Sequence, residues 1–160
     1  MTISQPVTAV ALLLKIAQSY TWVRETGGQN KGEAVAHFLE KVNVHDAEPW
    51  CAAFVSTVGA DAFGADWPLP NAAYCPTLAA AASKKGLLFS YPVPGAVFLL
   101  YSASKARFHH TGFVIEPTGD REWQTVEGNT NEGGSPEGIG VFTRRRLFGA
   151  SDRFVWWWRP

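Results

Sequence analysis

Glu48-Pro49-Trp50-Cys51-Ala52-Ala53-Phe54-Val55 is the stretch around which the rest of the chain is organised. Proline is tolerated in the first turn of a helix, because its missing N–H would have no partner there. The residues after Pro49 predict a helix that begins near Cys51. We expect this helix to run to about residue 63 and to end at Gly64. The apolar residues at helical spacing from the cysteine, which should face the core, are Phe54, Val55 and Val58.

A cysteine at the start of a helix has two interpretations. The partial positive charge of a helix N-terminus lowers the pKa of a thiol and favours the nucleophilic thiolate. Most free cysteines, however, are small buried hydrophobes without a chemical role. The stretch alone leaves both interpretations of Cys51 open. A nucleophile would need a histidine as its base and a third polar group that orients the histidine.

The composition is that of a globular chain. Its 160 residues are 46% hydrophobic and 18% charged, and their formal net charge is zero. These values predict one domain over residues 1–160 with a hydrophobic core, and they give no electrostatic reason to expect nucleic acid as a partner. Two cysteines do not make a disulfide framework. A reduced nucleophile would suit synthesis in the cytoplasm.

No targeting or membrane-inserted segment is expected. Residues 9–14 form a short apolar run, but no positive residue precedes them and no small-residue cleavage site follows. We therefore do not predict a signal peptide. No apolar stretch approaches the length that a bilayer-spanning helix needs.

Helices are predicted in the first half of the chain and strands in the second half. Besides the cysteine helix, apolar residues at helical spacing predict helices over residues 6–25, 31–42 and 77–85. Short β-branched or aromatic runs, separated by turns such as residues 132–136, predict strands over residues 96–101, 111–116, 122–127, 139–144 and 153–158. This order indicates an α+β fold in which N-terminal helices pack on a C-terminal antiparallel sheet.

Four histidines could activate the thiol. His37 lies within a predicted helix and His45 in a polar loop, whereas His109 and His110 open a predicted strand. Because neighbouring residues of a strand point to opposite faces, only one of these last two can face the cysteine. Gly112 leaves space beside His110, which suits the close approach of another element. Strand geometry alone leaves the choice between His109 and His110 open.

Two polar residues could orient the imidazole. Glu127 and Asn129 end a predicted strand with the same parity, so both can point toward one face. The alternative is a strand that ends in a hydrogen-bonded, asparagine-rich turn. No metal site or cofactor is predicted, because the chain has no Cys-x-x-Cys or His-x-x-x-His pair.

Several aromatic and basic residues have both a structural and a functional interpretation. Trp50, Trp67 and Tyr74 could wall a substrate groove, but core packing is an equal alternative. Residues 156–158 are three consecutive tryptophans, which fit a last strand better than a sugar-stacking surface. Residues 144–146 are three arginines, which fit a solvated strand end better than a phosphate site.

The ordered set of motifs resembles the CHAP domain, a cysteine- and histidine-dependent amidohydrolase and peptidase family related to the NlpC-type peptidases and, in its fold, to papain. The matching segments are Pro49-Trp50-Cys51-Ala52-Ala53-Phe54-Val55, Pro94-Gly95-Ala96-Val97, His110-Thr111-Gly112-Phe113-Val114, Val126-Glu127-Gly128-Asn129-Thr130-Asn131 and Gly138-Ile139-Gly140-Val141-Phe142. The resemblance implies that Cys51 is the nucleophile and that His110, rather than His109, is the general base. It places Glu127 and Asn129 at the polar positions that orient the imidazole.

The resemblance also implies a substrate, bacterial peptidoglycan. The expected reaction is hydrolysis of an amide bond, either in the stem or cross-bridge peptides or between N-acetylmuramic acid and L-alanine. A monomeric phage or prophage endolysin, which reaches the cell wall after release or injection, is the expected context. The alternatives are an amidase toxin delivered by a secretion system and a non-catalytic phage structural or wall-binding module with the same fold.

Overall fold

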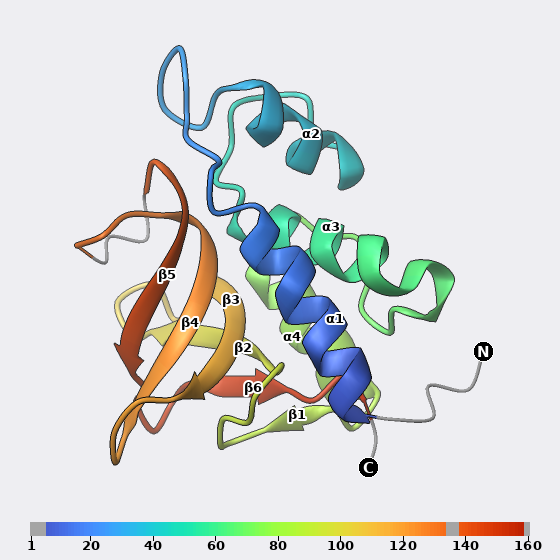
Figure 1. Ribbon diagram of the computed structural model, residues 1–160, viewed down its shortest axis with the longest axis vertical. Helices are drawn as coiled ribbons and strands as arrows, with labels where there is room; N and C mark the ends of the chain where they lie inside the picture. Colours follow the sequence, from blue (N-terminus) through green and yellow to red (C-terminus); the bar gives the residue numbers. More distant parts are fainter. Residues whose placement is uncertain (1–5, 134–137, 159–160) are drawn as a thin grey trace.

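The computed structural model describes residues 6–133 and 138–158, and it has an α+β fold (Figure 1). The predicted turn at 132–136 lies partly outside these ranges. The helices are α1 (Pro6–Ser19), α2 (Glu33–Lys41), α3 (Cys51–Phe63), the short 3₁₀ helix η1 (Gly64–Asp66) and α4 (Cys75–Lys84). The strands are β1 (Leu88–Phe89), β2 (Val97–Ser102), β3 (Arg107–Pro117), β4 (Glu122–Thr130), β5 (Gly140–Leu147) and β6 (Arg153–Val155). The predicted fold class is therefore confirmed: four N-terminal α-helices pack on a C-terminal antiparallel sheet.

The sheet has the strand order β1-β6-β2-β3-β4-β5, and every neighbouring pair is antiparallel. Strands β2 to β5 follow the chain as a meander, and β6 returns to lie between β1 and β2. His110 is paired with Leu100 of β2, and Glu127 is paired with Phe142 of β5. The neighbouring strands β3 and β4 thus carry the candidate histidine and carboxylate side by side.

Helix α3 is the buried centre of the helical layer. Its residues from Cys51 to Gly59 are all buried. The ring of Phe54 lies edge-on to Phe38 of α2 and to Phe113 of β3, with centroid separations of 5.6 and 6.1 Å. Gly128 of β4 lies so close that an added Cβ would be 2.7 Å from the Cβ of Phe54. This packing fixes the start of α3 against β3 and β4.

A second, smaller apolar cluster covers the other face of the sheet. Its buried members are Ala96, Phe98, Val114 and Phe154. Partly buried side chains, including Trp123 and Phe148, close this cluster from outside. Because both faces are covered, a polar side chain in the middle of β3 or β4 must find its partners within the protein.

Two predicted elements end earlier than expected, and one short strand was not predicted. The helix predicted over 6–25 ends at Ser19, because the next residues join the sheet: Glu25 N–H donates to Ile139 O at 2.7 Å, beside β5. The strand predicted over 153–158 ends at Val155. Trp157 beyond it is buried and donates its indole N–H to Gly95 O at 2.8 Å. The two-residue strand β1 was not predicted, because two residues are too few to show the alternation of apolar and polar side chains that marks a strand.

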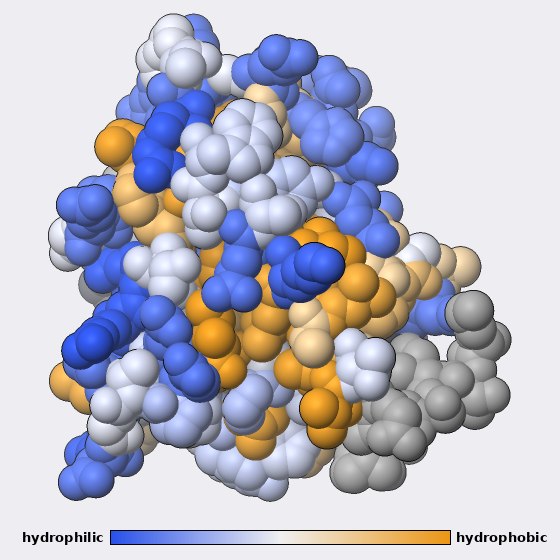
Figure 2. All heavy atoms as spheres, in the orientation of Figure 1, coloured by the Kyte–Doolittle hydropathy of each residue, from blue (hydrophilic) through white to orange (hydrophobic). Residues whose placement is uncertain are grey.

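The outer surface of α1 carries apolar side chains. Figure 2 shows an apolar strip along the position of this helix, whose most exposed large members are Val7 and Leu12. Among the described helices, none has the length and apolar character needed to cross a membrane.

Candidate active site

Cys51 is the first residue of α3, and its side chain is 5% exposed. The first backbone N–H groups of a helix have no carbonyl partner within the helix. The residue before it, Trp50, provides no side-chain cap for them. The thiol therefore lies beside a set of N–H groups that can receive a negatively charged oxygen.

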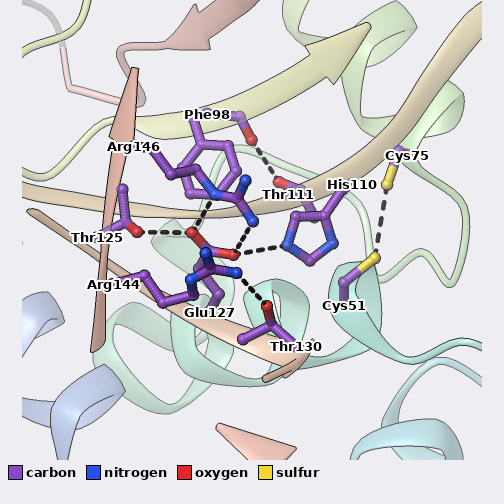
Figure 3. A network of polar contacts seen from close by, with 10 residues as sticks. All are labelled: Cys51, Cys75, Phe98, His110, Thr111, Thr125, Glu127, Thr130, Arg144 and Arg146. Carbon is purple, nitrogen blue, oxygen red and sulfur yellow. Dashed lines mark hydrogen bonds and ion pairs between the residues drawn. The ribbon is translucent and has the colours of Figure 1, made fainter. Parts of the chain in front are cut away.

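His110 is fully buried in β3, and its two ring nitrogens face different partners. Nε2 lies 2.8 Å from Oε2 of Glu127. Nδ1 has no hydrogen-bond partner within the part of the chain that the structure describes, and Figure 3 shows it on the ring edge that faces Cys51. The imidazole thus bridges the thiol and the carboxylate.

Glu127 is a fully buried carboxylate with four donors around it. Its Oε1 accepts from Thr125 Oγ1 at 2.6 Å and from Arg146 Nε. Its Oε2 accepts from Arg146 Nη2 at 2.6 Å, in addition to His110 Nε2 (Figure 3). A two-pronged arginine contact of this kind fixes both the charge and the orientation of a carboxylate.

These contacts shift the pKa values of the three groups in a consistent way. Burial raises the pKa of Glu127, but His110 and Arg146 outweigh it and lower the pKa to about 2. Burial lowers the pKa of His110, but the neighbouring Cys51 and Glu127 raise it to about 9. The pKa of Cys51 lies well below its ordinary value, since a hydrogen bond from Cys75 lowers it most, burial opposes this and His110 lowers it further. These shifts favour a thiolate on Cys51, an imidazolium on His110 and a carboxylate on Glu127.

Cys75 is a second thiol at the site that sequence reasoning did not assign. It is the first residue of α4, is 3% exposed, and its Sγ lies 3.8 Å from Sγ of Cys51. The hydrogen bond to Cys51 and burial both raise the pKa of Cys75 well above its ordinary value. Cys75 is thus the protonated member of the pair and the donor. The chain separation of 24 residues gave no sign of this contact in the sequence.

An open groove leads to the two sulfurs. It has a volume of about 410 Å³ and is lined by residues that include Cys51, Cys75, Tyr74, Lys105, Arg107 and His109. Tyr74 is 49% exposed, and the Arg107 guanidinium lies 5.1 Å from the centre of its ring. Of the three aromatic residues predicted to wall a groove, Tyr74 occupies such a position.

The other two predicted groove residues are buried in the core. Trp50 is fully buried, stacks on Phe38 at 5.5 Å and donates its indole N–H to Glu25 Oε1 at 2.8 Å. Trp67 is 7% exposed and packs against Phe63 and Trp157. Both positions fit the alternative prediction of core packing, because the surrounding side chains cover nearly all of each ring.

His109 and Asn129 lie near the site without making its contacts. His109 is half-buried, its Nδ1 lies 3.1 Å from Leu100 O, and burial lowers its pKa. Asn129 was predicted to orient the imidazole together with Glu127. Its side chain is buried, but neither of its amide atoms has a hydrogen-bond partner among the described residues, and its φ is 54°. The carboxylate of Glu127, and not the Asn129 amide, contacts His110.

Arg146 was missed by sequence reasoning, which predicted a solvated strand end for residues 144–146. The prediction holds for Arg145, whose side chain is 71% exposed, but Arg146 is 14% exposed and binds Glu127. Arg144 donates to Thr130 Oγ1 at 3.1 Å. Strand alternation was the available signal, because it places the first and third arginines on one face, toward β4.

The described residues contain no group of three or more His, Cys, Asp or Glu side chains that could hold a metal ion. Comparisons of this chain with protein-family models, with curated proteins and with solved structures give no match.

Proposed function

We propose that this chain is a thiol-dependent amide hydrolase of the CHAP type, with a papain-like arrangement of its helix and sheet. One observation carries the proposal: Cys51 at the start of α3, His110 of β3 and Glu127 of β4 lie in line, and Cys51 also lines an open groove. A thiol, an imidazole and an orienting carboxylate in this order are the parts that nucleophilic acyl transfer requires.

The mechanism follows from the charges of the three groups. The Cys51 thiolate attacks the carbonyl carbon of a bound amide, and the Cys51 backbone N–H stabilises the oxyanion that forms. His110 then gives its Nδ1 proton to the leaving amine, which breaks the C–N bond and leaves a thioester. A water molecule gives a proton to the same nitrogen and attacks the thioester, which releases the carboxylic acid product and restores the Cys51 thiolate and the His110 imidazolium. Glu127 holds the imidazole in place throughout.

The proposed substrate is bacterial peptidoglycan, and the support for it is the resemblance of the sequence motifs to the CHAP domain. The bond is an amide of the stem or cross-bridge peptide, or the N-acetylmuramoyl-L-alanine bond. A phage or prophage endolysin is the favoured context. A secreted amidase toxin would share the chemistry, and the presence of a neighbouring immunity gene would distinguish it.

Mass spectrometry of digested muropeptides tests this proposal, because it reports both activity and the bond that is cut. We expect the purified protein to release new amine and carboxyl ends, and Cys51→Ala and His110→Gln to release none. His37→Gln, which changes an exposed histidine on α2, is the matched control and should keep its activity. Equal release by Cys51→Ala would contradict the thiol mechanism. Binding of peptidoglycan without any cleavage would favour a wall-binding module.

A further inference from the structure

The two cysteines of the chain face each other across the candidate site. Both are free, each is the first residue of a helix, and their sulfurs are 3.8 Å apart (Figure 3). A disulfide bond is about 2.05 Å long, so small rotations of the two cysteine side chains could bring the sulfurs to bonding distance. The mechanism proposed above needs only one of the two thiols.

The contact between the two helices that carry these cysteines is firmly held. Ser56 of α3 accepts from Ala72 N–H at 3.1 Å and donates to Ala72 O at 3.2 Å. These bonds attach the segment before α4 to the second turn of α3. Lys85, just after α4, donates to Pro68 O at 2.5 Å. These contacts hold the first residues of α3 and α4 close together, so the two sulfurs can meet without a rearrangement of the backbone.

Small solutes have a route to both sulfurs. Cys51 and Cys75 line the same groove, whose volume is about 410 Å³. Tyr74 and Arg107 form part of its open wall. A low-molecular-weight disulfide or a peroxide is small enough to enter this space.

We propose that Cys51 and Cys75 are a reversible disulfide site, formed by a small disulfide or peroxide oxidant that enters the groove. The bond would block the nucleophile, so the chain would be active when reduced and inactive when oxidised. This consequence for activity rests on the proposed function, whereas formation of the bond does not.

The chemistry balances with either oxidant. With a small disulfide, the Cys51 thiolate attacks one sulfur and releases one small thiol; the Cys75 thiol loses its proton to water and attacks Sγ of Cys51, which releases the second small thiol. With hydrogen peroxide, the Cys51 thiolate becomes a sulfenic acid and hydroxide leaves; Cys75 then displaces water. In both cases the two protein thiols lose two electrons, which the oxidant takes up.

A nearby resolving thiol also protects a reactive one. A sulfenic acid that is not captured can be oxidised further to sulfinic and sulfonic acids, which thiol reductants do not reverse. Capture by Cys75 would stop the oxidation of Cys51 at the reversible stage. Cys75→Ser is the matched variant, because its hydroxyl keeps a hydrogen-bond donor beside Cys51 but cannot form the disulfide.

The test uses the full chain, reduced and then treated with oxidised glutathione or with hydrogen peroxide near neutral pH. Peptide mapping by mass spectrometry and counting of free thiols after denaturation report the bond. For the native chain we expect both thiols to disappear, a linked Cys51–Cys75 peptide within one molecule, and full recovery of both thiols with dithiothreitol. Cys75→Ser should instead carry a glutathione adduct, or sulfinic acid, on Cys51.

Activity on peptidoglycan, normalised to each protein's own reduced form, is the second readout. Oxidation should reduce the native chain to the level of Cys51→Ala, and reduction should restore it; peroxide should inactivate Cys75→Ser without recovery. Two persistent thiols, or a disulfide found only between molecules, would overturn the proposal. An intramolecular disulfide in a chain that never cleaves peptidoglycan would uphold the disulfide site and contradict only the proposed function.

Discussion

Glu127 determines which nitrogen of His110 can exchange a proton with Cys51. Because the pKa of Glu127 is held at about 2, this carboxylate is ionised near neutral pH and can only accept hydrogen bonds. The His110 Nε2, at 2.8 Å from it, must therefore carry a proton. The proton that moves during catalysis is consequently the one on Nδ1, which faces Cys51 (Figure 3). A buried carboxylate thus fixes the tautomer as well as the orientation of the base.

The two thiols should differ in their reaction with iodoacetamide. Cys51 should be alkylated well below the pH at which an ordinary thiol reacts, because Cys75 and His110 lower its pKa. Cys75 should resist alkylation in the same range, because its pKa is raised. Mass spectrometry of alkylated peptides over a pH series measures both. The same pH dependence for the two residues would show that Cys51 is not activated.

The rate of amide hydrolysis should depend on pH through His110. Its pKa of about 9 means that the imidazolium, which protonates the leaving amine, is lost as the pH rises through that value. We expect kcat/KM on a soluble muropeptide to fall above about pH 9, and to fall in acid as the Cys51 thiolate is protonated. A rate that continues to increase above pH 10 would be incompatible with His110 as the acid.

At the scale of elements, the site depends on how closely α3 approaches β4. Gly128 allows this approach, since a Cβ there would lie 2.7 Å from Phe54 Cβ and 2.8 Å from the Trp50 ring. The same strand carries Glu127 one residue earlier. Because α3 carries Cys51 and β4 carries Glu127, the distance between these two elements determines the distance between the thiol and the carboxylate that the His110 ring must bridge.

Gly128→Ala should therefore destabilise the protein and weaken the site. Overpacking of a filled core costs about 1–3 kcal/mol of unfolding free energy. Gly119→Ala is the control, because a Cβ at this turn position would meet Glu122 only at an ordinary 3.7 Å. Urea unfolding of both variants measures the difference. Equal stability of the two would mean that α3 can move away from β4 without cost.

Arg145 of β5 faces solvent, whereas Arg144 binds Thr130 and Arg146 binds Glu127. Arg146→Met should lower the free energy of unfolding by about 3 kcal/mol, because it removes one of the two cationic partners of the buried Glu127. It should also raise the pKa of Glu127 and reduce kcat. Arg145→Met is the matched control; its ion pair with Glu122 is exposed and is worth at most about 1 kcal/mol. Similar losses in both variants would contradict a specific role for Arg146.

At the scale of the whole molecule, the site joins segments that are far apart in the chain. Cys51 comes from α3, Cys75 from α4, and the remaining groups from β3, β4 and β5. The sheet order brings the three strands side by side, and the helical layer covers one of their faces (Figure 1). Global unfolding should therefore separate all these groups together, and their pKa shifts contribute to the stability of the whole fold.

Acid should destabilise the protein through Glu127. Its pKa falls from 4.5 to about 2 on folding, so its contribution is complete above pH 4.5 and is lost as the pH falls toward 2. Between about pH 6.5 and 9, the raised pKa of His110 makes the free energy of unfolding fall as the pH rises, whereas the lowered pKa of Cys51 makes it increase. We therefore expect little net change in the free energy of unfolding over this range. Thermal unfolding across pH measures this. In acid, the unfolding temperature of Glu127→Gln should fall less steeply with decreasing pH than that of the native chain. An equally steep fall would assign the acid sensitivity to other groups.

The sequence by itself determined what local physics controls. The proline before Cys51 and the glycine after residue 63 predicted the bounds of α3, and the change from helical to strand periodicity predicted the α+β class. Strand parity left the choice between His109 and His110 open, and the resemblance in motif order favoured His110. The predictions of single elements depend on residues within a few positions of one another, and the motif order depends on the linear sequence alone, which is why both were accessible without coordinates.

Only the tertiary structure decided which distant groups meet. It selected Glu127 over Asn129, placed Arg146 against that carboxylate, buried Trp50, and brought Cys75 to 3.8 Å from Cys51. A contact across many residues depends on strand order, helix packing and the exclusion of water. Strand alternation can assign a residue such as Arg146 to a face, but it does not identify the partner, so a buried polar side chain finds its partner only when the whole chain has folded around it.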